Sequence, residues 1–480
     1  MIAVASTAVD GLPRFMTNVS DAELDIVRGL MKTWIEKRPG NVRNSMYYDG
    51  KMPLRPTGNI PPEAMARIRA SLGWPERAVG GLGDRMIFDG FAAPDQGEDP
   101  FELEEILDGN RFDLELPQAI TSSLKHSCSF ITTARGDVAS GEPEILVMAR
   151  SAEWSAAKWD KRRRRVSSYM AITDVDEHGR ASAVDVYLPD VVLLCRRRSS
   201  GAWTAERKAN ALGEVWAEPL AFDPQLDRPF GRSRITRGVR TITDHAIANI
   251  IRTEIGADFY AAPRMLALGV GESAFAKSKW ALAIDRWLAI SRDENGDLPT
   301  VTQMAQMTTQ PLADLHRIYA SQIAGETGLP ISSLGIVQDN PPSAEALYAA
   351  EKDLIVKSRA QVRVYGAALR QVARRIVRLR DGKDAYAEEL RGLQASWLDP
   401  AFTSPVTASA ALEQLSRVFP WFAESPEALK FAGFSGPTVT RLLADKRRAE
   451  GSGTMAALIE AARRPATGET ASPSEAVGGV

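Results

Sequence analysis

The densest clusters of charge in this 480-residue sequence are two runs of basic side chains, Lys161–Arg165 and Arg196–Arg198. Such runs can neutralise DNA phosphates, but they also occur as solvated edges that discourage strand pairing. Neither run has interleaved aromatic residues, so stacking on single-stranded bases is not indicated. The sequence therefore favours solvated edges and leaves DNA contact as a second interpretation.

One segment resembles a calcium-binding loop. Asp174, Asp176, Gly179 and Asp185 occupy its first, third, sixth and twelfth positions. His178 stands at the fifth position, where calcium prefers oxygen, and the twelfth position lacks the bidentate Glu. The flanking residues have strand character, so the segment predicts a plain hairpin turn and no metal site.

Patterns typical of catalysis are missing. The sequence contains no phosphate-binding G-x-x-x-x-G-K-[ST] loop, no H-E-x-x-H pair and no G-x-S-x-G turn. The four histidines are scattered without ligand spacing, and there are two cysteines, Cys128 and Cys195. We therefore expect no catalytic residue, no metal site and no cofactor, and we expect the histidines to be structural and the cysteines reduced and buried.

Composition adds broad limits. Hydrophobic residues make up 44% of the chain, charged residues 25%, and the net charge is −2. This is an ordinary globular composition, and the length predicts two to four modules. A protein that grips nucleic acid tightly usually carries a basic excess, so tight binding is not favoured. The sequence has no run apolar enough for a membrane span and no signal-peptide pattern near its start, so we expect synthesis in the cytoplasm without membrane contact.

The longest element that the sequence predicts is one helix from Ala344 to Arg380, about 55 Å long. A compact domain of about 100 residues has a radius of gyration near 13 Å, so this helix indicates a strut in something larger than a monomer. Its apolar residues share one face. The opposite face carries arginines, which are either solvated or contact a neighbouring subunit or DNA: Arg359, Arg363, Arg370, Arg374 and Arg378.

Two further long helices are predicted around a small insert. The first begins near Gly231 or Ser233 and ends before Pro263, and the second runs from Leu312 to Thr327. A capping box at Ser20 starts another helix, and short strands with turn signals fill residues 127–207. We predict an α+β, mainly helical chain, with a strand at 86–91 and shorter helices at 62–72, 75–79, 100–107, 117–124, 409–419, 426–431 and 437–448.

The order and spacing of several segments resemble the portal proteins of tailed double-stranded-DNA bacteriophages, of the siphophage type common in phages of actinobacteria. The resemblance covers about residues 20 to 450 and implies a non-enzymatic ring, usually a homododecamer, at one capsid vertex of the virion. The genome would enter and leave through this ring. The matching segments are Tyr47–Gly50, Leu72–Pro75, Asp84–Arg85, Phe88–Phe91, Pro229–Arg234 and Gly328–Pro330 through Ala344–Ala346.

The resemblance also implies a division into parts. Two stem helices, at 231–262 and 309–328, would bracket a small α/β clip at 263–308. The other parts would be an α+β wing at 19–230, a tunnel-loop region at 329–343, a long wing helix with its connection at 344–398 and a helical crown at 399–450. The sequence itself, apart from the resemblance, predicts a flexible arm at 1–18 and a disordered tail at 451–480, where Gly, Ala, Thr, Ser and Pro accumulate.

Functional residues follow only from that resemblance. The tunnel loop would face DNA and bind it without sequence specificity, with Gln338, Asp339, Asn340 and Ser343 as candidates. The clip would dock the large terminase subunit and later the head-completion or adaptor proteins, while major capsid and scaffold proteins would surround the ring. The docking candidates in the clip are Trp280, Arg286, Arg292, Glu294 and Asp297.

Two other interpretations stay open. A nucleic-acid-modifying enzyme would need paired carboxylates at a metal, and the sequence shows no convincing set. A helical scaffold protein without a DNA role would form open filaments instead of closed rings.

Overall fold

The computed structural model of the chain describes residues 13, 15–53, 68, 70–94, 99–260, 265–268, 300–303, 308–336, 344–401, 405–434, 438–439 and 441–449. These residues form a mixed α+β structure that divides into two compact units, Met1–Pro400 and Ala401–Val480. Among the described residues, no helix is long and apolar enough to cross a membrane. The predicted α+β class is thus confirmed.

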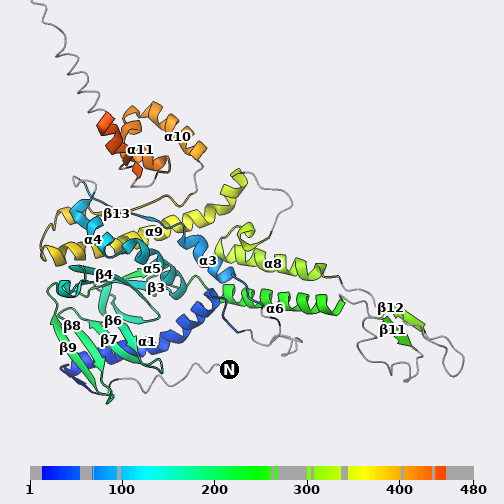
Figure 1. Cartoon of the computed structure of the whole chain (residues 1–480), viewed down its shortest axis with the longest axis horizontal. Helices are drawn as coiled ribbons and strands as arrows, with labels where there is room; N and C mark the ends of the chain where they lie inside the picture. The colour runs from blue at the N-terminus through cyan, green and yellow to red at the C-terminus, as the bar shows by residue number, and fades with distance from the viewer. Residues whose placement is uncertain are drawn as a thin grey trace, which may run out of the picture. The chain divides into compact units, whose positions relative to one another are not determined.

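The larger sheet of the first unit is covered on one face by helix α1 (Asp21–Tyr48) (Figure 1). Leu24, Val27, Leu30 and Trp34 of α1 are buried in the core beneath it. The predicted capping box is present, because Ser20 Oγ accepts from Glu23 N and the Glu23 carboxylate accepts from Ser20 N. The six strands lie in the order β1 (Met16–Thr17), β9 (Trp203–Ala209), β8 (Val191–Arg197), β7 (Ala181–Tyr187), β6 (Arg165–Val175) and β5 (Ser155–Asp160).

A second, three-stranded antiparallel sheet lies between helices. Helix α5 (Phe112–His126) and helix α9 (Ala344–Arg380) both pack on it, so the main hydrophobic core gathers here. Its strand order is β10 (Ala217–Ala221), β3 (Cys128–Arg135) and β4 (Ile145–Ser151). A separate pair, β2 (Phe88–Ala92) with β13 (Gln394–Trp397), joins residues about 300 positions apart in the sequence.

Two helices lie side by side and extend from this body, α6 (Arg237–Tyr260) and α8 (Gln310–Thr327) (Figure 1). Asn249 Nδ2 on α6 donates to the Leu312 carbonyl on α8 at 2.8 Å. Between them in sequence, β11 (Met265–Leu268) pairs with β12 (Thr300–Gln303). The described residues of this unit also form α3 (Trp74–Gly83), α4 (Leu103–Gly109) and the short 3-10 helices η2 (Pro100–Glu102), η3 (Val138–Ser140), η5 (Ile331–Leu334) and η6 (Glu389–Arg391).

The second unit is helical, as predicted. It contains α10 (Pro405–Val418), η7 (Pro420–Glu424), α11 (Pro426–Phe431) and helical residues at 438–439 and 441–449. Ser425 caps α11 by accepting from Ala428 N at 3.3 Å. Trp421 is 70% exposed, so this small unit leaves a large aromatic side chain uncovered in the single chain.

The predicted helix 344–380 is confirmed at both ends as α9. The predicted start of α6 near Gly231 or Ser233 is wrong, since the helix begins at Arg237. The preceding residues are held by longer-range hydrogen bonds, from Arg232 N to Phe222 O at 2.9 Å and from Arg234 N to Leu124 O at 2.8 Å. Because these backbone groups are bonded to distant segments, residues 232–234 do not join the helix.

The predicted end of the helix at 75–79, before Gly80 and Gly81, is also wrong, because α3 continues to Gly83. A Cβ placed on Gly81 would lie 2.4 Å from Leu329 Cδ2, so this glycine permits a close approach inside the helix instead of ending it. The predicted helix 62–72 falls largely outside the described residues, and residues 70–72 are not helical.

Candidate functional site

The segment Pro229–Arg234 joins the sheets of the body to α6. Gly231 has a φ of +70°, and a Cβ there would lie 2.0 Å from the Phe222 carbonyl oxygen. A side chain would therefore clash with backbone, and the left-handed conformation disfavours one as well. Only glycine lets the chain make this turn.

The buried side chain of Arg234 stabilises the same junction. Its residue is 5% exposed, and its Nη2 donates to the Thr327 carbonyl at the end of α8 at 2.8 Å. Its Nε donates to the carbonyl of Ala78 in α3. Burial lowers the pKa of the Arg234 guanidinium to about 10, so it remains charged near neutral pH. One side chain therefore connects the start of α6, the end of α8 and α3.

A buried polar cluster surrounds His126. Its Nε2 lies 2.9 Å from Ser45 Oγ, and its Nδ1 lies 3.2 Å from Ser122 Oγ and from Ser151 Oγ. Ser45 Oγ donates to Glu153 Oε2 at 2.9 Å, which completes a Ser–His–Glu set. The histidine is only 6% exposed, and burial together with the Lys125 charge lowers its pKa to about 3. The imidazole is thus neutral and out of reach of a substrate, which suits a structural role.

The arginine face of α9 is partly occupied by the chain's own groups. Arg359 Nη2 lies 3.0 Å from both carboxylate oxygens of Asp399. Arg374 Nε donates to Leu390 O at 3.0 Å, and Arg378 Nη1 donates to Glu214 Oε1 at 3.1 Å. Three of the five predicted contact residues therefore bind within the subunit.

The other two candidates on this face are Arg363, which is exposed, and Arg370, which is half-buried. Within the described part of the chain, neither forms an ion pair. Subunit or DNA contact by this face would therefore involve these two positions.

The second basic run and the calcium-like segment neutralise each other. Arg196 Nη1 lies 2.8 Å from Asp185 Oδ1, and Arg197 Nη1 lies 3.3 Å from Asp176 Oδ2. Asp176 also accepts from Arg180 Nε at 2.8 Å, within the hairpin turn between β6 and β7. Where the structure is described, no group of three or more His, Cys, Asp or Glu side chains could hold a metal ion.

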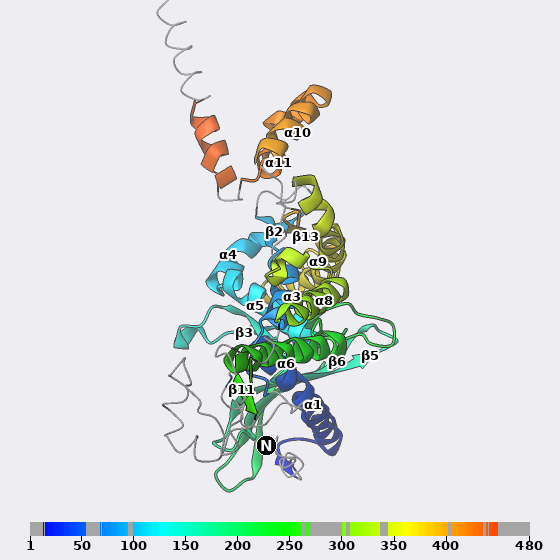
Figure 2. The same ribbon diagram turned by 90° about the vertical axis from the view of Figure 1, so that its right-hand side faces the viewer.

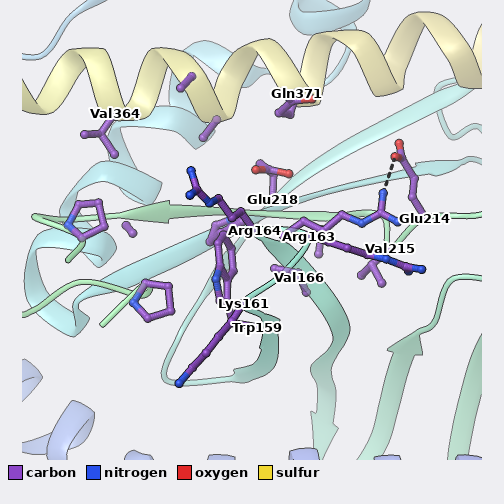
Figure 3. Close-up of a pocket in the computed structure, with 18 of the residues that line it drawn as sticks. Trp159, Lys161, Arg163, Arg164, Val166, Glu214, Val215, Glu218, Val364 and Gln371 are labelled. Atoms are coloured by element: carbon purple, nitrogen blue, oxygen red, sulfur yellow. Dashed lines mark ion pairs between the residues drawn. The ribbon is translucent and has the colours of Figure 1, made fainter. Parts of the chain in front are cut away.

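The first basic run lines a cavity of about 1160 Å³, which we call the basic groove (Figure 3). The turn between β5 and β6 and the start of β6 contribute four cations to one wall, and α9 contributes Val364 and Gln371 to the wall above it. Residues of the 224–229 segment and β10 complete the lining. The four cations are Lys161, Arg163 and Arg164 of the turn and Arg165, the first residue of β6.

The floor of the basic groove is a buried arginine between two carboxylates. Arg375 Nη2 lies 3.2 Å from Glu218 Oε2, and Arg375 Nε lies 3.6 Å from Glu214 Oε1. Burial raises the pKa of Glu218, while the Arg375 charge opposes that rise. Arg375 is 5% exposed, and its Nη1 has no hydrogen-bond partner among the described residues. An unmatched donor is therefore buried in one of the residues that line the groove.

Sequence reasoning missed this groove and Arg375. The groove combines residues near 160, 220 and 370, which only the tertiary fold brings together. One signal was available, because Arg375 lies between Val372 and Ile376 on the apolar side of the predicted helix. The loop candidates Gln338, Asp339, Asn340 and Ser343 lie outside the described residues, as do the insert candidates Trp280, Arg286, Arg292, Glu294 and Asp297.

Comparison with known proteins gives a consistent result. Residues 31–419 match a family described as phage portal protein, SPP1 Gp6-like. The chain is 28% identical over 386 residues to the portal protein of Mycobacterium phage L5, which covers 77% of this chain and 76% of the phage protein. It is 28% identical over 403 residues to the portal protein of Mycobacterium phage D29, which covers 81% of each.

Proposed function

This chain belongs to the SPP1 Gp6-like family of phage portal proteins, and from this premise we propose how its parts serve a portal. Portal proteins are structural components of the phage capsid, so this chain functions in the virion. We propose that its copies close into a ring at one vertex, and that double-stranded DNA passes through the central channel during packaging and ejection. The ring requires a head-to-tail interface that closes on itself.

The observation that carries the proposal is the side-by-side pair of α6 and α8, with the insert between their ends. A helix pair extending from a body buries only part of its surface in its own subunit. Ile318 on α8 is 52% exposed, and a neighbouring subunit would cover such a side chain. Copies of this pair, arranged around an axis, would form the wall of the channel as stem helices.

The other parts take their roles from this arrangement. The α+β body up to residue 230 would form the wing, and α9 would be the long wing helix that links it to the stem. The helical second unit would form the crown. Residues 263–308 would form the clip at the far end of the stem.

We expect the ring to bind DNA only weakly, so that the duplex can move through the channel. A surface that neutralises many phosphates would hold the duplex in place, whereas the net charge of this chain is −2. The tunnel loop at 329–343 would touch the DNA backbone through small polar groups, namely Gln338, Asp339, Asn340 and Ser343. Energy for translocation would come from a separate motor.

Partner proteins would meet the ring at different places. The clip would receive the large terminase subunit during packaging and head-completion or adaptor proteins afterwards. Major capsid and scaffold proteins would contact the outer surface of the wing during assembly in the host cytoplasm. The clip contacts would include Trp280 and the charged residues Arg286, Arg292, Glu294 and Asp297.

The test is the assembly state of the purified full-length chain. Mass photometry should give a single large species of several subunits, and negative-stain images of that species should contain rings with a central channel. A monomer that persists across protein concentrations and salt conditions would contradict the proposal. Open filaments without closed rings would favour the scaffold interpretation.

A further inference from the structure

The structure points to a socket for a neighbouring copy of the chain, an inference that rests on the proposed ring. We propose that the basic groove receives the acidic corner of the adjacent subunit. We define the acidic corner as Glu105 and Asp108 of α4 with Asp113 and Leu114 at the start of α5. Repeated around an axis, this contact would be the heterologous interface that closes the ring.

The basic groove is incomplete in a single chain. The groove cations Lys161, Arg163 and Arg164 are exposed. At the rim, Leu226 is fully exposed, with a relative exposure of 102%. An occupant that brings carboxylates together with an apolar side chain would match both features.

The acidic corner has the matching chemistry. Its three carboxylates are exposed, and none of them forms an ion pair with the residues that the structure describes. Leu114 stands among them with 57% of its surface exposed. The groove offers the complement, because Lys161, Arg163, Arg164 and Arg165 line it together with apolar residues such as Trp159 and Val364. Charge and apolar surface would therefore be matched across the contact.

The two surfaces also face in different directions, as a closed ring requires. Arg375 lines the groove, whereas Arg380 faces the start of α4, since its Nη1 lies 3.1 Å from Glu102 Oε2. The two arginines are five positions apart on α9. Five positions correspond to about 140° around a helix. Figure 2 agrees, since α4 lies on the left and β5 and β6 extend to the right. A subunit therefore cannot fill its own groove with its own corner.

DNA is a weaker candidate for the occupant. A duplex carries one charge per roughly 1.7 Å of its axis and needs an evenly basic, open surface. The groove instead contains Glu214, Glu218 and Asp227 beside its cations, and its floor is closed by Arg375. A mixed, partly apolar concavity suits a protein surface better than a phosphate backbone.

Cross-linking tests the contact directly. The double variant Arg163→Cys with Asp113→Cys should, after treatment with a short bismaleimide, give a ladder of covalent multimers on a denaturing gel. The native thiols will not compete, because Cys128 and Cys195 are buried and burial raises the pKa of each to about 12. The matched control is Arg198→Cys with Asp113→Cys, which places the first thiol on the other basic run and should give no ladder.

Charge exchange tests the electrostatic match. Arg163→Glu with Arg164→Glu should raise the protein concentration needed for ring formation by at least about tenfold, because like charges would then face each other. Adding Glu105→Arg and Asp108→Arg should restore assembly. Arg198→Glu, an equally exposed reversal outside the groove, should leave assembly unchanged.

The outcomes separate this inference from the proposed function. Wild-type rings with a channel, combined with no ladder and unimpaired assembly of the Arg163→Glu, Arg164→Glu variant, would overturn the socket and leave the portal assignment intact. Absence of rings in the wild-type protein would overturn the ring itself. If the reversal weakens binding of a short DNA duplex while assembly is unaffected, the groove contacts nucleic acid and the socket is wrong.

Discussion

At the scale of single residues, this chain buries polar groups with opposite consequences. His126 is neutral and surrounded by hydroxyl groups, so its polarity is matched only while it stays unprotonated. Arg375 is charged and depends on two carboxylates. Protonation of His126, or loss of the ion pairs of Arg375, should therefore lower the free energy of unfolding of the first unit, although both side chains are buried.

His126 should make the stability of the protein depend on pH. The unfolded chain binds a proton at this side chain near pH 6.5, whereas the folded chain resists protonation until about pH 3. Between these values the unfolded state binds more protons. The contribution of His126 to the free energy of unfolding is therefore fully present above pH 6.5 and decreases as the pH falls toward 3. From pH 7.5 to pH 5 the loss from this group should be about 2 kcal/mol.

Chemical denaturation at a series of pH values measures this effect. The His126→Gln variant should lose about that much of the pH dependence, and His178→Gln, which alters an exposed histidine, should retain it. An unchanged pH profile in His126→Gln would show that this imidazole does not govern acid stability.

Arg375 should be costly to remove alone. Arg375→Met leaves Glu218 buried beside Glu214 without a cation and should lower the free energy of unfolding by about 3 kcal/mol. Adding Glu218→Gln should recover much of this loss, because the uncompensated carboxylate is then neutral. Urea denaturation of the single and double variants checks this. Equal stability of both variants would mean that Glu218 is already protonated in the folded chain.

At the scale of elements, the sequence pattern predicted those helices whose bounds depend on neighbouring residues in the chain. Helix α9 was predicted to its ends because its apolar spacing and flanking residues agree over 37 residues. The start of α6 was misjudged because the bonds from Arg232 and Arg234 to Phe222 and Leu124 come from distant segments. The β2–β13 pair and the basic groove could not be predicted either, since they need contacts between residues hundreds of positions apart.

Gly231 should be the least replaceable residue of the junction before α6. Gly231→Ala places a Cβ against the Phe222 carbonyl in a left-handed conformation, and we expect a loss of about 3 kcal/mol. Gly141→Ala is the matched control, since φ is +87° there but the space around a Cβ is open, and its cost should be about 1 kcal/mol. Thermal unfolding of the two variants compares them, and equal midpoints would show that the turn tolerates a side chain.

At the scale of the whole molecule, folding and DNA passage should be separable. Deleting residues 338–342 shortens the proposed tunnel loop and should leave ring formation unchanged, while packaging or retention of DNA in particles decreases. Ring images and the DNA content of assembled particles measure the two properties. Failure of this variant to fold would assign the segment to the core of the subunit.

The pairing of β11 with β12 has a practical consequence for imaging. Met265 and Gln303 are opposite each other on adjacent strands, so their Cα atoms are only about 5 Å apart. A foreign protein whose N- and C-termini lie close together could therefore replace the residues between Met265 and Gln303. Its two ends would match the spacing of the two strands, so α6 and α8 would not need to move apart. Such a graft would carry a visible marker on every copy in the assembly and would orient the particle in electron micrographs.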